Sequence, residues 1–432
     1  MQTRFDALIV GAGPAGSSAA ILLATAGWSV ALVEKQAFPR RKVCGECVAA
    51  SNMPLLDALD IGGDIADTAG PELKRVALMH GAHSVWADLP AAADARHAWG
   101  RAIGRETLDT LLMARARASG ATVLQPWAVQ KLAGVGISRH CTVREAASGK
   151  LKHLQAPVVI LAHGSWEHLP DERAVQRLTR GSSDLLAFKA NFSGAQLAPG
   201  ILPVLAFDGG YGGMVLADGD LVTLACCIRA DRLEALRRAA PGKAAGDVVE
   251  DMLRRQCRGV AEALDGAMRC GNWLASGPLR PGVRLRNDED VFRIGNAAGE
   301  AHPIIGEGIS MALQSAWLLC AQLEAARPSQ GADTQVIWQR GAQQRYTADW
   351  RRHFAPRLRV AAGLAHLAMR PAGAAVLMAT LKQFPKLLTH GAIWSGKVTG
   401  IGDGSTPGVG RQRWPQTTAM QALQRHLPGE LP

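Results

Sequence analysis

A glycine-rich motif near the start of the chain constrains the fold more than any other feature. Residues 5–10 form an apolar run of strand length, Gly11-x-Gly13-x-x-Gly16 follows at once, and residues 17–24 have the composition of a helix. In such a unit the first glycine permits a tight turn, the second lets a pyrophosphate approach the backbone, and the third allows close helix–strand packing. The pattern therefore predicts a nucleotide-binding βαβ unit.

An acidic residue follows the motif at the distance that a dinucleotide site requires. A second apolar strand is predicted at residues 29–33, and Glu34 comes directly after it, 23 positions beyond Gly11 (34 minus 11). Its carboxylate can accept hydrogen bonds from both hydroxyls of an adenosine ribose and would repel a 2′-phosphate. FAD or NAD is therefore favoured over NADP as the resident nucleotide.

The composition is that of an ordinary globular protein with a basic surface. Of 432 residues, 48% are hydrophobic and 20% are charged, and the formal net charge is +11. No basic run is interleaved with aromatic residues, so we expect no nucleic-acid partner. Eight cysteines without regular spacing and the lack of a signal peptide favour the cytoplasm. No window reaches the roughly 18 uninterrupted apolar residues of a membrane span, so we expect a soluble or membrane-peripheral protein.

The predicted elements indicate an α/β fold: a Rossmann-like FAD domain with an inserted antiparallel β substrate domain and C-terminal helices. A glycine-rich turn is predicted at 209–213 and one amphipathic helix at 244–264. A second Gly-x-Gly-x-x-Gly unit is absent from the sequence, so NADH or NADPH would bind only transiently as electron donor. The predicted boundaries are 1–72, 100–183 and 280–345 for the FAD domain, 73–99 and 184–279 for the substrate domain, 346–400 for the helical region and 401–432 for a flexible tail.

Three further stretches extend the pattern along the chain. Lys42-Val43-Cys44-Gly45 lies in a polar loop, Arg105 opens a predicted helix, and residues 293–309 combine a strand, a loop and a second helix start. In the last stretch, the Asn296 side chain can bond a ribityl hydroxyl. The helix that starts near Gly308 directs N–H groups at the part of a flavin that becomes negative on reduction.

With the first glycine motif, these stretches resemble the FAD-dependent oxidoreductases built like para-hydroxybenzoate hydroxylase, and within them the geranylgeranyl reductase-like branch. Residues 42–45 are similar to the branch's Lys-x-Cys-Gly loop, which carries a cysteine beside the flavin, and residues 293–309 resemble the second FAD motif. The resemblance implies FAD as cofactor. The cofactor-binding residues predicted from the motifs and the resemblance are Gly11, Gly13, Pro14, Ala15, Gly16, Glu34, Lys35, Lys42, Cys44, Gly45, Arg105, Gly295, Asn296, Pro303, Gly306, Gly308 and Ile309.

Departures from the family pattern limit the set of reactions that we expect. Asn296 and His163 stand where the family usually has aspartate. Residues 211–214 match the Tyr-x-Trp-x-Phe-Pro strand of isoprenoid reductases only in part. The Trp-x-Trp-x-x-Pro motif of flavin halogenases is missing, since Trp166 is followed by Glu-His-Leu. We therefore do not expect halogenation.

Several residues are candidates for the chemistry. Cys44 and Cys47 form a Cys-x-x-Cys pair that fits a zinc site, a flavin-coupled disulfide, or unpaired thiols. In the last case, either Cys44 is a functional thiol packed near the flavin or both are ordinary buried cysteines. Zinc needs four ligands and no second pair exists, so we predict no metal site. His302, inside the cofactor loop, is a candidate acid or base, or else a structural hydrogen-bonding residue. Tyr211 is a catalytic candidate that would line the substrate domain, although its glycine neighbours equally fit a simple turn. Two further acid–base candidates are Glu46 and Glu307.

Three enzymatic reactions fit these features: oxygenation with O2, reduction of a carbon–carbon double bond, and dehydrogenation. We expect a monooxygenase acting on a hydrophobic aromatic or polyketide-like small molecule. The alternative is a geranylgeranyl reductase-like enzyme acting on isoprenoid or lipid double bonds. A non-catalytic flavin-bearing protein that binds a membrane or partner is the third hypothesis, which only the basic residues 354–397 favour. That segment fits a cap on the FAD domain or helices that touch the inner face of the membrane peripherally.

Overall fold

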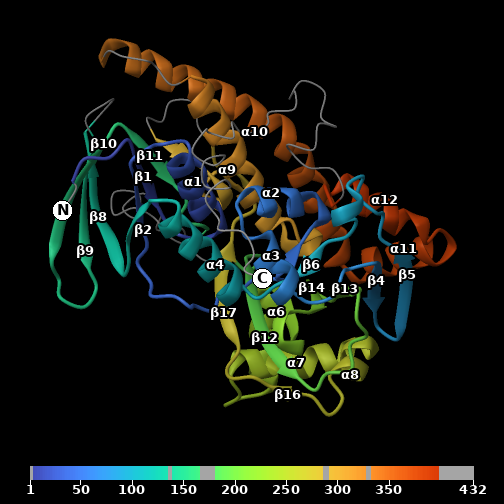
Figure 1. Ribbon diagram of the computed structural model, residues 1–432. Helices are drawn as coiled ribbons and strands as arrows, with labels where there is room; N and C mark the ends of the chain where they lie inside the picture. The colour runs from blue at the N-terminus through green and yellow to red at the C-terminus, as the bar shows by residue number, and fades with distance from the viewer. Residues whose placement is uncertain (1–2, 135–138, 166–180, 286–290, 327–331, 398–432) are drawn as a thin grey trace, which may run out of the picture.

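A parallel five-stranded sheet forms the nucleotide-binding half of the computed structural model (Figure 1). The structure describes residues 3–134, 139–165, 181–285, 291–326 and 332–397, so the predicted tail and the Trp166 segment lie outside the described residues. The strand order is β19-β11-β1-β2-β7, and every pair is parallel. These strands are β1 (Ala7–Val10), β2 (Val30–Val33), β7 (Thr122–Leu124), β11 (Val158–Leu161) and β19 (Phe292–Arg293).

Both faces of this sheet are covered, which is why its three central strands, β11, β1 and β2, are apolar throughout. Ala7 and Ile9 of β1 face a core with the helices α1 (Pro14–Thr25), α4 (Arg105–Ala118) and α9 (Gly308–Ala325). Leu8 and Val10 face the opposite side. There the antiparallel strands β8 (Trp127–Ala133), β9 (Arg139–Glu145) and β10 (Leu151–Ala156) close a second core.

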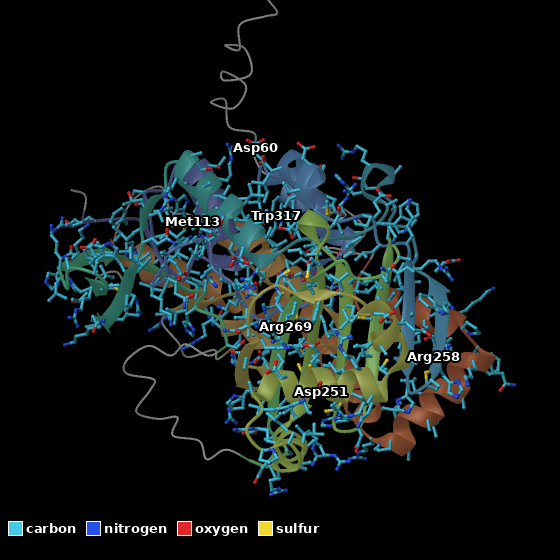
Figure 2. All side chains as sticks on the ribbon, turned by 90° about the horizontal axis from the view of Figure 1, so that it is seen from below. Asp60, Met113, Asp251, Arg258, Arg269 and Trp317 are labelled. Atoms are coloured by element: carbon cyan, nitrogen blue, oxygen red, sulfur yellow. The ribbon has the colours of Figure 1, made fainter. Side chains whose placement is uncertain are left out.

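A mixed eight-stranded sheet forms the other half of the molecule. Its order is β16-β12-β15-β14-β13-β4-β5, with β17 beside β12, and only β13 and β4 pair in parallel. Figure 2 labels Met113 and Trp317 in the nucleotide-binding half and Asp251, Arg258 and Arg269 in this half. The strands are β4 (Arg75–His80), β5 (His83–Asp88), β12 (Leu185–Ser193), β13 (Ile201–Phe207), β14 (Gly210–Leu216), β15 (Val222–Arg229), β16 (Met268–Arg269) and β17 (Leu274–Leu279).

Helices cover both faces of the mixed sheet as well. One face packs on α6 (Ala230–Ala239), α7 (Ala245–Gln256) and α8 (Arg258–Ala263). The other packs on the end of α10 (Ala332–Ala368) and on α11 (Pro371–Gln383), and α12 (Lys386–Trp394) follows beside β5. The smaller elements are β3 (Cys47–Val48), α2 (Met53–Ala58), α3 (Gly62–Thr68), β6 (Arg101–Ala102), β18 (Gly282–Val283) and β20 (Gly299–Glu300).

The α/β fold class is confirmed, but two local predictions are wrong. Residues 244–264 form two helices instead of one, because Cys257 has an extended backbone (φ −133°, ψ 105°). The predicted turn at 209–213 is confined to its start, and residues 210–213 belong to β14. Glycine stands at 210 because neighbouring chains approach closely: a Cβ atom there would lie 2.4 Å from the Cys227 carbonyl oxygen.

The C-terminal helices can also be compared with the predicted domain boundaries. Helix α10 runs without a break across position 345, where the FAD domain was predicted to end, and the domain limits stay a prediction. Among the described residues, no single helix is long and apolar enough to cross a membrane. The bent pair Trp338–Ala368 and Pro371–Gln383, at 106° to each other, meets the length and composition criteria together.

Candidate functional site

The first glycine motif makes a sharp turn, and the surrounding backbone leaves no room for a side chain at two of its glycines. Gly11 has a φ of +101°, and a Cβ atom on it would lie 2.6 Å from the Ala162 carbonyl oxygen. A Cβ atom on Gly16 would lie 1.8 Å from the Gly11 carbonyl oxygen. Close packing of α1 on β1 therefore depends on both glycines, as the motif predicts.

Gly13, by contrast, faces two guanidinium groups across open space. A Cβ atom on Gly13 would have Nη2 of Arg105 at 3.8 Å and Nη2 of Arg40 at 4.0 Å as its nearest neighbours. Arg105 donates two hydrogen bonds to Asp109, at 2.8 and 2.7 Å, and Arg40 lies 3.4 Å from the same carboxylate. Burial opposes the charge on Arg105, but Asp109 outweighs it and holds the pKa of Arg105 above its ordinary value.

This arrangement fits the pyrophosphate of a dinucleotide. Helix α1 starts at Pro14, and among the described residues no side chain caps its first N–H groups. A helix N-terminus of this kind attracts anions. Nε and Nη1 of Arg40 are buried and have no hydrogen-bond partner among the described residues, so they remain available as donors. A phosphate beside Gly13 would satisfy donors that the protein alone leaves unpaired.

Glu34 is buried at the end of β2, but its carboxylate already holds the loop in place. Oε2 accepts a hydrogen bond of 2.9 Å from the Ala12 N–H, and Oε1 accepts one of 2.9 Å from the Gln36 N–H. Arg40 lies 3.8 Å away. The predicted contact with ribose hydroxyls stays a prediction, and so does that of Lys35, whose side chain is exposed.

Glu46 connects the two halves of the molecule. It has a left-handed backbone conformation (φ +58°) and is buried. Its carboxylate accepts hydrogen bonds from the Arg105 N–H at 2.8 Å, from the Thr223 hydroxyl at 2.6 Å and from the ammonium group of Lys189. These contacts give Glu46 a structural role and leave it poorly suited to the acid–base role considered from the sequence.

The two cysteines of the Cys-x-x-Cys pair have different surroundings, and all eight cysteines are free thiols. The Sγ of Cys44 is half-buried and accepts a 3.3 Å hydrogen bond from the Glu46 N–H. Cys47 is buried in β3, where burial raises the pKa of its thiol. The disulfide interpretation therefore has no support in this structure. Among the described residues, no group of three or more His, Cys, Asp or Glu could hold a metal ion.

The second cofactor motif packs against the first one and takes part in a chain of side-chain hydrogen bonds. Gly295 (φ +58°) packs against Ala15 of α1, since a Cβ atom there would lie 3.0 Å from the Ala15 Cβ. The Asn296 amide donates to the Ser165 hydroxyl at 2.8 Å, and Ser165 donates to Glu300 at 2.7 Å. The motif thus brings residues 295–296 to the N-terminal glycine loop, where a shared cofactor would contact both.

His302 and Tyr211 are brought together from opposite halves of the molecule. The Tyr211 hydroxyl lies 3.2 Å from Nδ1 of His302, and both side chains are buried. Burial and then His366, whose ring centroid is 5.7 Å away, lower the pKa of His302 to about 4. Burial also raises the pKa of Tyr211 above its ordinary value. Both side chains are consequently uncharged at neutral pH.

Pro303 and Gly306 shape the loop that leads into α9. Pro303 starts a 3₁₀ turn that ends at Gly306 in the left-handed region (φ +64°), and Gly308 is the first residue of α9. Glu307 is fully buried beside Lys397 at 3.3 Å and Arg357 at 3.8 Å. These contacts with two cationic side chains give Glu307 a structural role at the start of α9.

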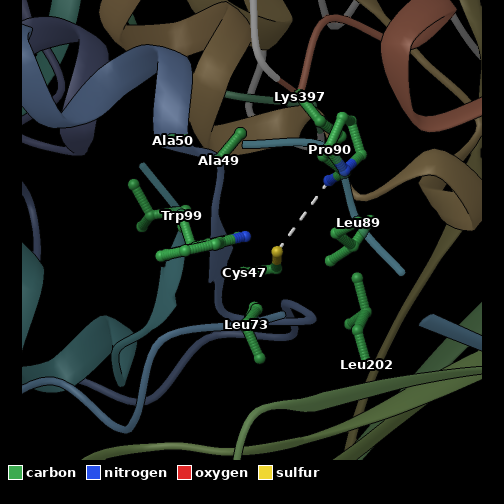
Figure 3. A pocket seen from close by; sticks show the side chains of 11 residues that line it. Cys47, Ala49, Ala50, Leu73, Leu89, Pro90, Trp99, Leu202 and Lys397 are labelled. Atoms are coloured by element: carbon green, nitrogen blue, oxygen red, sulfur yellow. Dashed lines mark hydrogen bonds between the residues drawn. The ribbon is translucent and has the colours of Figure 1, made fainter. Parts of the chain in front are cut away.

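A small apolar pocket is lined by Cys47, Trp99, Leu202 and Lys397, among other residues (Figure 3). Its volume is about 20 Å³, enough for roughly one water molecule. The Lys397 ammonium enters it and lies 3.8 Å from Sγ of Cys47. Burial opposes the charge on Lys397, but Cys47 and Glu307 outweigh it and keep its pKa above the ordinary value. The pocket is too small for an organic substrate.

Sequence reasoning missed several residues of this site. Arg40 lies in a polar loop that gave no signal beyond its place after Glu34. Lys189 is a charged residue in an apolar strand pattern, which is a detectable sign of a buried ion pair. Ser165 and His366 reach the site only through tertiary contacts.

The fold and the site define a dinucleotide-binding protein, and comparison with known proteins identifies its family. A family model described as "FAD binding domain" matches residues 4–229, more than half of the chain. The chain therefore belongs to this family, its cofactor is FAD, and it is an FAD-dependent oxidoreductase.

Curated relatives match over short stretches. A tryptophan 2-halogenase of Chondromyces crocatus is 34% identical over 132 residues, 31% of this chain and 23% of that protein. A menaquinone reductase of Mycolicibacterium smegmatis is 54% identical over 46 residues, 11% of each chain. That of Mycobacterium tuberculosis is 34% identical over 119 residues, 28% of each. The matched stretches thus span less than a third of each relative's length.

Solved structures match over nearly the whole chain. The myxobacterial chondrochloren halogenase CndH has a TM-score of 0.71 at 17% identity, with 93% of this chain and 94% of that chain covered. PqsL of Pseudomonas aeruginosa, described as a probable FAD-dependent monooxygenase, has a TM-score of 0.65 at 16% identity, with 87% and 100% covered. Identities this low establish the fold and leave the reaction open.

Proposed function

We propose that this protein is an FAD-dependent monooxygenase that hydroxylates or epoxidises a hydrophobic aromatic or polyketide-like molecule. For hydroxylation the balance is substrate R–H, O2, NAD(P)H and a proton giving R–OH, water and NAD(P)+. The C–H bond is replaced by C–O, the second oxygen atom leaves as water, and the nicotinamide supplies the two electrons. NADH or NADPH visits transiently, since the sequence holds one dinucleotide motif.

The observation that carries the proposal is the buried pair Tyr211–His302. It lies where the second cofactor motif meets the substrate sheet, and the two side chains come from those two elements. A phenol or enol of the substrate would there find neutral hydrogen-bonding groups in apolar surroundings. Tyr211 belongs to an apolar cluster that also contains Leu78 and Val85, and Val43 and Ile304 pack against this cluster.

The charge state of His302 limits what it does. A pKa of about 4 leaves the imidazole neutral at neutral pH, so it is not a general acid there. A neutral imidazole accepts one hydrogen bond and donates another. In this proposal His302 orients the Tyr211 hydroxyl, and the pair together positions a polar group of the substrate.

Bound FAD supplies the electron transfer and oxygen chemistry. In this proposal the glycine loop, Arg40 and Arg105 would hold its pyrophosphate, and residues 295–309 would hold its flavin. The apolar core around Tyr211 excludes water from the substrate side.

Turnover with and without oxygen tests the proposal. The purified FAD-loaded protein is incubated with NADH or NADPH and a panel of phenols and aromatic polyketides, in air and in an oxygen-free chamber. We expect products heavier by one oxygen atom in air and no organic product without oxygen. Products that gain two hydrogen atoms under both conditions would contradict monooxygenation.

Reduction of a carbon–carbon double bond is the second candidate function. It is supported by Lys42-Val43-Cys44-Gly45, with Cys44 beside the Glu46 backbone, and by the short matches to menaquinone reductases. Oxygen-independent turnover of an isoprenoid quinone, lost in Cys44→Ser, would favour it. Retained turnover in Cys44→Ser would remove the role of that thiol.

A further inference from the structure

The surface of the C-terminal helices is unusually apolar. Among the described residues, ten large hydrophobic side chains are exposed, and seven of them lie between positions 360 and 394. The most exposed of these seven are Trp394 at 68%, Val376 at 62% and Phe384 at 56%. Figure 1 shows α11 and α12 at the edge of the molecule, next to β5. The seven residues, here called the C-terminal patch, are Val360, Leu367, Val376, Phe384, Leu387, Ile393 and Trp394.

Helix α11 is apolar on both of its faces. Its inner face, with Ala374, Met378 and Leu381, packs on the mixed sheet. Its exposed face carries Val376 and small residues, and the helix has no charged residue before Lys382. A surface helix of a globular protein normally presents polar residues to solvent. An exposed apolar face of this kind therefore indicates a covering partner.

The charge around the patch identifies the chemistry of that partner. Residues 350–402 contain eight Lys or Arg residues and no Asp or Glu. Arg357 and Lys397 pair internally with Glu307, but Arg370, Lys382 and Lys386 are exposed beside the apolar side chains. Apolar side chains including tryptophan, in a segment whose charged residues are all cations, match the interface of an anionic bilayer.

We propose that the C-terminal patch binds the protein peripherally to an anionic phospholipid membrane. The apolar side chains enter the headgroup boundary, and the flanking cations contact lipid phosphates. Helix α10, whose His366 reaches His302, connects this surface to the candidate site. The binding does not depend on which reaction the site performs.

Vesicle co-sedimentation of the FAD-loaded full-length protein tests the proposal. The vesicles are phosphatidylcholine alone or phosphatidylcholine mixed with phosphatidylglycerol. We expect binding to the anionic vesicles only, weakened by salt, and reduced at least about tenfold in Phe384→Ser/Trp394→Ser and in Lys382→Glu/Lys386→Glu. Leu151→Ser/Met268→Ser is the matched control, since it removes two exposed apolar side chains elsewhere, and should bind like wild type.

Two results would overturn the proposal. One is that the wild-type protein does not bind anionic vesicles. This includes the case in which the patch forms a dimer that the Phe384→Ser/Trp394→Ser variant dissociates. The other is vesicle binding that both patch variants retain in full. Unchanged flavin absorbance and thermal midpoint in the variants establish that they are folded, so a loss of binding belongs to the surface.

Discussion

The hydroxyl of Tyr211 lies 3.2 Å from Nδ1 of His302, although the two residues are 91 positions apart. The contact joins β14 of the substrate sheet to the loop that carries the second cofactor motif. Because both groups are buried and neutral, their hydrogen bond is sensitive to the loss of either partner.

Removing the Tyr211 hydroxyl is expected to slow turnover. Tyr211→Phe leaves His302 without this partner, and we expect kcat to fall about tenfold, the effect of one lost buried hydrogen bond. Tyr346→Phe is a matched control, because that buried tyrosine donates to the Arg293 carbonyl at 2.7 Å and lies in the core of the nucleotide-binding half. Equal losses in both variants would argue against a role of Tyr211 in the reaction.

The low pKa of His302 predicts a pH effect on stability. The folded pKa of about 4 lies below the ordinary value of 6.5, so between these values the unfolded chain binds the proton and the folded chain does not. Stability contributed at this position is full above about pH 6.5 and falls as the pH drops toward 4. His302→Asn should flatten this part of the curve of unfolding free energy against pH. An unchanged curve would show that His302 titrates normally.

Substitutions at two glycines of the first motif are expected to have different effects on FAD binding and on stability. Gly13→Ala has room for its Cβ atom and should fold, but we expect FAD to bind at least about tenfold more weakly because the methyl group blocks the approach of the pyrophosphate. Gly16→Ala places its Cβ atom against the Gly11 carbonyl and should destabilise the apoprotein by about 3 kcal/mol or more. Thermal unfolding of the apoproteins and FAD titration separate the two effects.

Arg40 is expected to contribute to FAD affinity more than to stability. Arg40→Gln removes a guanidinium whose Nε and Nη1 have no hydrogen-bond partner among the described residues, so we expect about tenfold weaker FAD binding with less dependence on salt. Arg96→Gln, a change at an exposed arginine, is the control. Tight, unchanged FAD binding in Arg40→Gln would place the pyrophosphate elsewhere.

The buried pair Glu46–Lys189 is expected to show strong coupling. Glu46→Gln leaves the Lys189 ammonium buried without its anion and should cost about 3–5 kcal/mol in unfolding free energy. Glu46→Gln/Lys189→Met should lose much less than the sum of the single variants. Denaturant unfolding measures the cycle, and additive losses would mean that the pair is not coupled.

The predictions from sequence succeeded where neighbouring residues decide the structure. The spacing of Gly11, Gly13 and Gly16 placed β1 and α1, because the steric need for glycine is local. Glu46 could not be assigned its role, since Lys189 and Thr223 lie 143 and 177 positions away. Strand β13 was also missed. It contains Pro203, which normally argues against a strand inside a sheet.

The prediction from sequence was also wrong for two glycines that are needed for close packing between strands. Gly210 and Gly212 were assigned to a turn, but they lie in β14, where a Cβ atom on Gly212 would be 2.6 Å from the Ala225 carbonyl oxygen. A sequence does not distinguish a glycine needed for its backbone angle from one needed for close contact. Because of this ambiguity, the sequence did not indicate that Tyr211 lies in strand β14.

Isotope labelling of oxygen tests the central claim most directly. The FAD-loaded protein is supplied with NADH or NADPH and with the substrate that the aerobic panel identifies, under ¹⁸O2 in ordinary water. Monooxygenation predicts that one ¹⁸O atom appears in the organic product and the other in water. A product without ¹⁸O, or one that takes its new oxygen from water, would contradict the account.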